Sequence, residues 1–388
     1  MQHALPYIVL VILYGGLAVI YHQTEDARKR SHLEIACITI FLFFFGLRGF
    51  VFYDWLGYYP NFYAVPDITD FSTADLTKWY SEPGLVVLMS LCKTLFPNYH
   101  FFVFVCTTIN LILLLRFFRR YSDNLPLGFV LFLCFNGIVI STDLMRNSIS
   151  LLLYINSLEY IEERRPIPFF AINLLGLIFH KTALLFLPLY FIINRKWNKW
   201  IVAVIFIVAN GMFLLHIPIL KSIISVIANF VDPSIKLYFD FYTKIDIGKS
   251  VAFGIGIGYL ERLFTSLLII CYIDKLRSIR PANNIFINSV ILYLVLFLVF
   301  SEFRTVSTRL SLIFSYGYWI IWADLIKCIT FRNNRLLFVA YIGIYCILRV
   351  YGSCNFALAD YENILLSSQS YNERLLIFRQ HFNDKTGI

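Results

Sequence analysis

Long apolar runs, separated by short polar segments, recur along the whole chain. A helix needs about 17–25 mostly apolar residues to cross a bilayer. The clearest runs near this length span 5–22, 34–53, 100–118, 125–142, 146–161, 198–216, 251–273, 285–301, 305–326 and 336–350. Hydrocarbon offers no hydrogen-bond partners, so a spanning segment forms a helix in which the backbone groups satisfy one another. The pattern therefore predicts an all-α fold, a polytopic transmembrane helical bundle.

Two segments depart from this pattern. Segment 167–193 has two apolar halves, each too short for a perpendicular span, on either side of His180-Lys181. It is either one helix with a charge at its centre or two short helices that meet near the outer face. Segment Gly84–Phe96 is apolar but short and contains Lys93. Its length and charge predict an interfacial or re-entrant helix.

Short basic clusters between the apolar runs indicate the topology, because loops rich in Lys and Arg face the cytoplasm. The clusters are Arg28-Lys29-Arg30; Arg116, Arg119 and Arg120; Arg164-Arg165; Arg195, Lys196 and Lys199; Lys275, Arg277 and Arg280; and Lys327, Arg332 and Arg335. All fall on one side if 167–193 crosses twice, the first run enters from outside and 83–97 does not span. This arrangement predicts about 12 crossings (10–12), with both termini outside.

The same topology predicts a single integral membrane domain over residues 1–388. A first outside loop at 54–99 contains the interfacial helix, and a second outside loop occupies 217–250. The tail at 351–388 is polar with a few apolar positions, which is compatible with a surface helix. No cleavable signal peptide is expected, because no basic region precedes the first run and the run is as long as a span.

Composition supports a membrane protein and excludes some other classes. Hydrophobic residues make up 59% and charged residues 15%, with a mean hydropathy of +0.71, whereas soluble domains carry about 25% charge. The net charge of +9 comes from the short clusters between runs, which suits contact with anionic lipid and not nucleic-acid binding. The eight cysteines form no C-x-x-C pair and no His-Cys metal spacing, and no Asp-x-Asp motif is present. We therefore predict neither a metal nor a cofactor.

A second set of charged residues remains once the six basic clusters are removed, and all of it maps to the predicted outer side. Each member has an ordinary interpretation: a snorkelling cation, a structural ion pair or a helix end. The gathering of cations on that face, against the positive-inside bias, favours a functional site. The set is Arg48, Asp54, Glu82, Asp143, Arg146, His180, Lys181, Glu261, Arg262, Glu302, Arg304, Arg309 and Arg349.

This mixture of residue types suits a lipid-linked pyrophosphate and a sugar. The planar fork of arginine binds phosphate, and lysine adds a point charge. Tyrosine and tryptophan offer platforms for sugar faces, and a carboxylate or histidine can take the proton of an attacking hydroxyl. The predicted catalytic residues are His180, Asp54, Glu82 and Glu302. The predicted pyrophosphate or glycan contacts are Arg48, Arg146, Lys181, Arg262, Arg309, Tyr58 and Tyr59, with Trp55, Trp79 and Tyr80 as further platforms.

These stretches, in this order, resemble the EpsG family of Wzy-like polysaccharide polymerases. Phe179-His180-Lys181-Thr182-Ala183-Leu184 is the most specific match, close to an F-H-K-[ST]-A-L pattern. The family has Arg-Gln where this chain has Arg146-Asn147. The other matching stretches are Gly46-Leu47-Arg48 with Asp54 and Tyr58-Tyr59, Glu82-Pro83-Gly84, Asp143 to Ser148, Glu261-Arg262-Leu263 and Arg309-Leu310.

The resemblance implies a glycosyltransferase with the helical fold called GT-C, in the bacterial inner membrane. Such an enzyme moves a growing glycan from one undecaprenyl pyrophosphate onto a repeat unit carried by another, on the outer face. Its expected partners are the lipid-linked donor and acceptor and the bilayer, and a chain-length regulator protein is a candidate partner. Two alternatives stay open at this point: a flippase or other transporter of lipid-linked oligosaccharides, and a ligase or single-sugar transferase of the same broad fold.

Overall fold

The computed structural model describes residues 2–72, 82–217 and 255–386. Of the described residues, 78% are helical, and among them no strand forms beyond isolated bridges such as that of Arg48 with Asn363. The all-α prediction is therefore confirmed. The predicted second outside loop, 217–250, lies almost wholly outside the described residues, as do Trp79 and Tyr80 of the first.

The chain divides into two compact units, and each is described by itself. Unit 1 comprises Met1–Tyr190 and Arg332–Ile388, and unit 2 comprises Phe191–Phe331. The helices of unit 1 are α1 (Leu5–Gln23), α2 (Ala27–Phe41), α3 (Trp55–Ala64), α5 (Pro83–Leu95), α6 (Tyr99–Tyr121), α7 (Leu125–Phe132), α8 (Ile138–Thr142), α9 (Met145–Glu162), α10 (Pro166–Phe179), α11 (Ala183–Phe186), α20 (Arg332–Cys354) and α21 (Tyr371–Thr386), with α12 (Leu189–Ile192) at its boundary. Those of unit 2 are α13 (Lys199–Leu214), α16 (Ile257–Ile279), α17 (Asn283–Val299), α18 (Arg304–Leu312) and α19 (Tyr316–Cys328).

Helix starts follow from capping residues in the polar segments. Asp26 accepts hydrogen bonds from the first backbone N–H groups of α2, and Asn98 and Asn124 do the same for α6 and α7. These side chains satisfy N–H groups that have no partner within the helix. The polar breaks between apolar runs therefore define where several helices begin.

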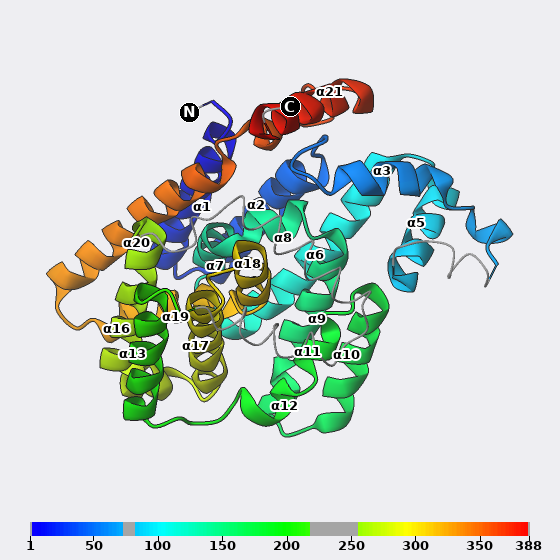
Figure 1. The fold of residues 1–388 in the computed structure, drawn as a ribbon. Helices are drawn as coiled ribbons and strands as arrows, with labels where there is room; N and C mark the ends of the chain where they lie inside the picture. The colour runs from blue at the N-terminus through cyan, green and yellow to red at the C-terminus, as the bar shows by residue number, and fades with distance from the viewer. Residues whose placement is uncertain (1, 73–81, 218–254, 387–388) are drawn as a thin grey trace. The chain divides into compact units, whose positions relative to one another are not determined.

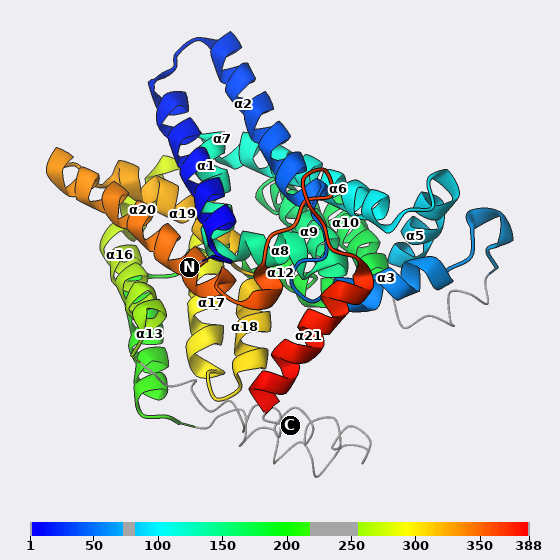
Figure 2. The same ribbon diagram turned by 90° about the horizontal axis from the view of Figure 1, so that it is seen from above.

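Within the described ranges, four helical segments are long and apolar enough to cross a membrane: α1, α6, the segment Leu125–Thr142 and α20. In Leu125–Thr142 a kink separates α7 from α8, because the backbone of Phe135 and Asn136 is not helical there. Shorter apolar helices are α5, α10, the pair α11–α12, α13 and α17. In unit 1, α1 packs against α2, α7 and α20, and α6 packs against α9 (Figures 1 and 2). The number of crossings, about 12, stays a prediction.

The broken segment 167–193 folds as two short halves that turn back on each other. Helix α10 ends at His180, whose backbone is extended, and α11 and α12 follow. Tyr190 of α12 contacts the ring of Phe169, near the start of α10, with a centroid distance of 5.1 Å. The halves therefore form a hairpin with His180 and Lys181 at its apex, as the two-helix alternative predicts, and the position of this apex near the outer face stays a prediction.

Two further predicted runs are interrupted. The run 34–53 leaves α2 through a π-helical turn, Leu42–Gly46, and is not helical beyond it. Gly46 allows this close packing, because a Cβ there would lie 3.0 Å from the ring of Phe104. The run 305–326 is divided into α18 and α19 by a turn over residues 313–315. Hydropathy alone does not register such breaks, because the residues on both sides are apolar.

Candidate functional site

Glu82 lies at the start of α5 and is held against the end of α10. Pro83 occupies the first turn of α5, where its missing N–H costs nothing. Gly84 then allows the start of α5 to approach the end of α10 closely, since a Cβ at this position would lie 2.9 Å from the Ile178 side chain and 3.0 Å from the Ile178 carbonyl oxygen. The Glu-Pro-Gly sequence thus places the Glu82 carboxylate beside the apex of the hairpin.

Arg146, in the first turn of α9, pairs with this carboxylate. Its Nη1 lies 2.5 Å from Glu82 Oε2, and its Nε donates to the Tyr58 hydroxyl at 2.6 Å. The Arg146 side chain keeps 31% of its surface exposed, against 10% for Glu82. Burial raises the pKa of Tyr58, so this residue stays a neutral phenol. The guanidinium is held in place by two contacts while other N–H donors remain for a ligand.

His180 faces the other oxygen of the same carboxylate. Its Nε2 lies 3.9 Å from Glu82 Oε1, and the side chain is 23% exposed. The oxygen atom of a bound hydroxyl group can lie about 2.8 Å, an ordinary hydrogen-bond length, from both His180 Nε2 and Glu82 Oε1. A substrate hydroxyl could therefore bind between His180 and Glu82.

Thr182 and Asn147 hold the other side of the imidazole. Nδ1 of His180 lies 2.9 Å from Thr182 Oγ1 and accepts from the Thr182 backbone N–H at 3.2 Å. Thr182 Oγ1 in turn donates to Asn147 Oδ1 at 2.6 Å. Nδ1 accepts from the Thr182 N–H in one tautomer of the imidazole. In the other, Nδ1 carries the proton and donates to Thr182 Oγ1, and Nε2 is then the basic nitrogen that faces Glu82. Asn147, where the resembled family has Gln, is therefore part of the histidine's support.

Asp54 and Asp143 join the loop after Arg48 to the start of α9. Asp143 Oδ1 accepts from the backbone N–H groups of Tyr53 and Asp54 at 2.7 and 3.0 Å, and Asp54 Oδ2 accepts from that of Met145 at 3.0 Å. Burial, with the nearby charge of Asp54, raises the pKa of Asp143 to about 7. The contacts of both carboxylates position the backbone around Arg146.

Arg48 is 5% exposed and points into unit 1. Its Nη1 donates to the carbonyl of Phe45 at 2.6 Å and to Thr107 Oγ1 at 3.1 Å. In this structure Arg48 therefore ties the π-helical turn to α6, and no contact joins it to the Glu82 carboxylate. Lys181, by contrast, is exposed at the hairpin apex, and no ion pair links it to the described residues.

The C-terminal tail packs against the same part of unit 1, which the sequence did not predict. Tyr371 stacks on Tyr59 with a centroid distance of 4.4 Å and an interplanar angle of 11°. Arg374 is 1% exposed; it lies 3.5 Å from the Glu362 carboxylate and donates to the carbonyls of Leu358 and Asp360. Tyr59, a predicted glycan contact, is thus partly covered. The spacing of Tyr371, Arg374, Leu375 and Phe378 was a helical signal that could have identified this buried face.

The remaining predicted residues belong to unit 2. Arg262 is 6% exposed: its Nη1 donates to the Gly258 carbonyl at 2.7 Å, and its guanidinium carbon lies 3.5 Å from the Phe297 ring centroid. Glu261 accepts from Thr265 at 2.7 Å. Glu302 is half-buried and Arg309 is exposed on α18. The structure therefore brings Glu82, Arg146, His180 and Tyr58 together, and describes Glu302, Arg262 and Arg309 in a separate unit.

The assembled group is a carboxylate between an arginine and a histidine, which come from the start of α5, the first turn of α9 and the apex of the hairpin. Arg116 and Arg120, near the end of α6, both pair with Glu159 of α9. Within the described ranges, no group of three His, Cys, Asp or Glu side chains could hold a metal ion. The arrangement can bind an anion at Arg146 and accept a proton at His180.

The helical architecture and apolar segments indicate a membrane protein, and the charged cluster around Glu82 belongs to unit 1. The chain belongs to the EpsG family, whose model matches residues 33–364. Membership is consistent with a polysaccharide-polymerase-like role of the glycosyltransferase type. No curated protein and no solved structure matches the chain.

Proposed function

We propose that the chain is a polysaccharide polymerase. It would transfer a growing glycan from undecaprenyl pyrophosphate to a lipid-linked repeat unit on the outer face of the bacterial inner membrane, within a GT-C-like fold. The observation that carries this proposal is the shared carboxylate of Glu82, which contacts Arg146 through one oxygen and faces His180 through the other. Family membership supports the same reaction class.

In the proposed reaction, the acceptor hydroxyl lies beside His180 Nε2. Its oxygen forms the new bond to the anomeric carbon of the donor, while the bond from that carbon to the pyrophosphate oxygen breaks. The hydroxyl proton passes to Nε2, and the pyrophosphate leaves with the bonding electrons. Glu82 stabilises the imidazolium that forms, because an opposite charge within about 4–6 Å favours the charged state.

Arg146 is the proposed pyrophosphate contact in this cluster. Its guanidinium is fixed by Glu82 and Tyr58 and still has exposed surface. A cation positioned before the reaction stabilises the charge that develops on a leaving group. Lys181, Arg48, Arg262 and Arg309 remain proposed contacts to pyrophosphate or glycan, and Asp54 and Glu302 remain candidates for proton transfer.

A test in detergent solution separates polymerisation from transport. The purified protein is mixed with lipid-linked repeat units, and the products are resolved by length; without a bilayer, a transporter has no two sides to connect. We expect a ladder of long products from the wild type. His180→Ala should insert normally and form far less polymer, since general base catalysis contributes about 10²–10⁴-fold.

Two outcomes would contradict the proposal. No product from a well-folded wild type, combined with transport of the same lipid after reconstitution, would favour a flippase. Products extended by one unit alone would indicate a ligase or single-sugar transferase. Unchanged chain length in His180→Ala would return His180 to a structural role.

A further inference from the structure

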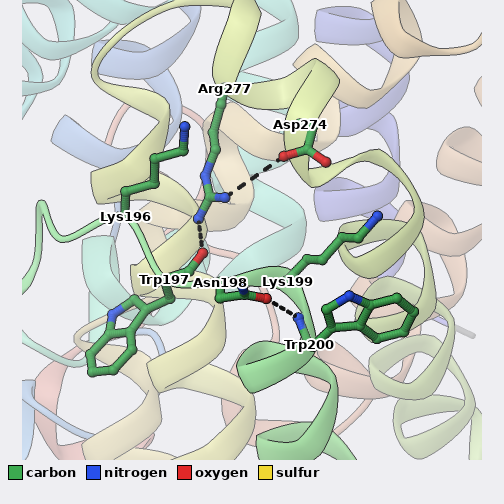
Figure 3. Close-up of a pocket in the computed structure, with 7 residues that line it drawn as sticks. All are labelled: Lys196, Trp197, Asn198, Lys199, Trp200, Asp274 and Arg277. Carbon is green, nitrogen blue, oxygen red and sulfur yellow. Dashed lines mark hydrogen bonds and ion pairs between the residues drawn. The ribbon is translucent and has the colours of Figure 1, made fainter.

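Unit 2 contains a basic cavity at the start of α13 that the proposed reaction does not use. Its volume is about 410 Å³ (Figure 3). None of its lining residues belongs to the cluster around Glu82. The lining is Lys196, Trp197, Asn198, Lys199, Trp200, Asp274 and Arg277.

Arg277 forms the fixed wall of this cavity. Its Nη2 donates to the Trp197 carbonyl at 2.7 Å, its Nε donates to Asn284 Oδ1 at 3.0 Å, and its Nη1 lies 4.0 Å from Asp274. Its side chain is 9% exposed, whereas that of Asp274 is 73% exposed. The one carboxylate in the lining thus lies beside Arg277 and is mostly in solvent.

Lys196 and Lys199 supply the positive charge available to a ligand. Both are exposed, they are drawn on either side of Arg277, and no ion pair links them to the described residues (Figure 3). The cavity also lies at the N-terminus of α13, where Asn198 accepts from the Trp200 N–H at 2.9 Å. The positive end of a helix dipole adds to the attraction for an anion.

An apolar cavity of about 200 Å³ shares the Trp197 wall. The one polar side chain in its lining, Asn288, donates to the carbonyls of Ile193 and Arg195, both at 2.7 Å. The Asn288 nitrogen stays paired when hydrocarbon fills the cavity, whereas its Oδ1 is buried with no hydrogen-bond partner among the described residues. Its lining is Ile192, Ile193, Trp197, Val202, Ile205, Asn288, Ile291, Leu292 and Val295.

The exposed face of α13 is also apolar. The exposed residues recur at helical spacing, and Trp200, at the basic end, is 68% exposed. Tryptophan is enriched where a membrane meets water. The exposed apolar side chains on this face are Trp200, Ile201, Val204, Ile207 and Val208.

We propose that these two cavities bind one anionic phospholipid. Its phosphate would lie between Lys196 and Lys199, and an acyl chain would enter the apolar cavity beside Trp197. A basic cavity next to an apolar one matches an amphiphile, whereas a free phosphate would use the first cavity alone. Basic pockets between membrane helices are known to recognise anionic headgroups.

The test compares ligands and variants of the detergent-purified protein. Binding of dioleoyl phosphatidylglycerol is measured by native mass spectrometry and by the shift in thermal midpoint, beside dioleoyl phosphatidylcholine and inorganic phosphate. In Lys196→Gln/Lys199→Gln we expect about 30-fold weaker phosphatidylglycerol binding, since each lysine near an anionic surface contributes about fivefold. Arg332→Gln/Arg335→Gln removes the same charge from another exposed segment and should bind as the wild type.

A second variant tests the acyl chain. Ile205→Trp fills the apolar cavity and should weaken binding of the dioleoyl lipid while leaving its dihexanoyl analogue little changed. Equal lipid binding by the lysine variant and the wild type would overturn the proposal. Inorganic phosphate that shifts the thermal midpoint as much as the lipid, with no effect of Ile205→Trp, would also overturn it, because the cavity would then be an anion site without an acyl chain.

Discussion

The replacement of Glu82 by glutamine tests whether one carboxylate serves both Arg146 and His180. The variant keeps the size of the side chain and removes its charge. At the 3.9 Å that separates Glu82 Oε1 from His180 Nε2, two unit charges interact by about 4 kcal/mol at an effective dielectric constant of 20. Because both side chains are partly exposed, solvent screening lowers this to about 1–3 kcal/mol. If the imidazolium forms in the transition state, the initial rate should fall about 5- to 150-fold.

The assay is the initial rate of polymer formation by purified protein with lipid-linked repeat units. Glu163→Gln is a matched control, because Glu163 pairs with Arg120 and Arg165 and lies just past the far end of α9. The double variant Glu82→Gln/His180→Gln should be about as slow as His180→Gln alone, since residues that act as a unit are not additive. An initial rate within twofold of the wild type in Glu82→Gln would refute this reasoning. Multiplicative losses in the double variant would show that the two residues act independently.

Three further substitutions test the surroundings of the site. Gly84→Ala would place a Cβ 3.0 Å from an α10 carbonyl oxygen and should cost about 1–3 kcal/mol of stability, whereas Gly57→Ala, with open space around it, should not lower the thermal midpoint. Arg374→Met should lower the free energy of unfolding by about 2–4 kcal/mol, because it leaves the buried Glu362 carboxylate without its partner. Arg379→Met, at an exposed position, should have little effect. Equal thermal midpoints for Arg374→Met and Arg379→Met would exclude an anchoring role for Arg374. Burial raises the pKa of Asp143 to about 7, so its contribution to stability is present below pH of about 3.8 and is lost as the pH rises through about 7. Thermal midpoints from pH 5 to 8 should therefore fall more for the wild type than for Asp143→Asn, and parallel curves would contradict the shift.

The sequence was sufficient to predict the helices because lipid imposes a simple requirement on the backbone. Apolar runs and polar caps placed α1, α6 and α9 within a few residues of their observed bounds. The break at His180-Lys181 was also recognisable, since charged groups interrupt an apolar run there. The order of short motifs drew attention to Glu82, Arg146 and His180, which the structure places in one cluster.

Other features depend on tertiary contacts that no local pattern encodes. The sequence does not reveal that Arg48 points inward to Thr107. An arginine at the end of an apolar run can extend to the lipid headgroups or turn into the protein, and both cases have the same sequence pattern. It does not show that Tyr371 covers Tyr59, a pair more than 300 positions apart in the chain. Asn147 was noticed as a departure from a motif, but its contact with Thr182 needed the packing of α9 against the hairpin.

The packing of the C-terminal tail against unit 1 has a consequence for labelling, because it relates the position of a label at the C-terminal end to that of the site. Arg374 and Tyr371 anchor the start of α21 beside the site, and α21 is not among the helices able to cross a membrane. His3, before α1, also lies 3.1 Å from Asp360 of this tail. We therefore expect a fluorescent or enzymatic reporter fused at either end of the chain to face the same compartment as Glu82 and His180, so that one such fusion would measure the sidedness of the reaction centre without any substrate.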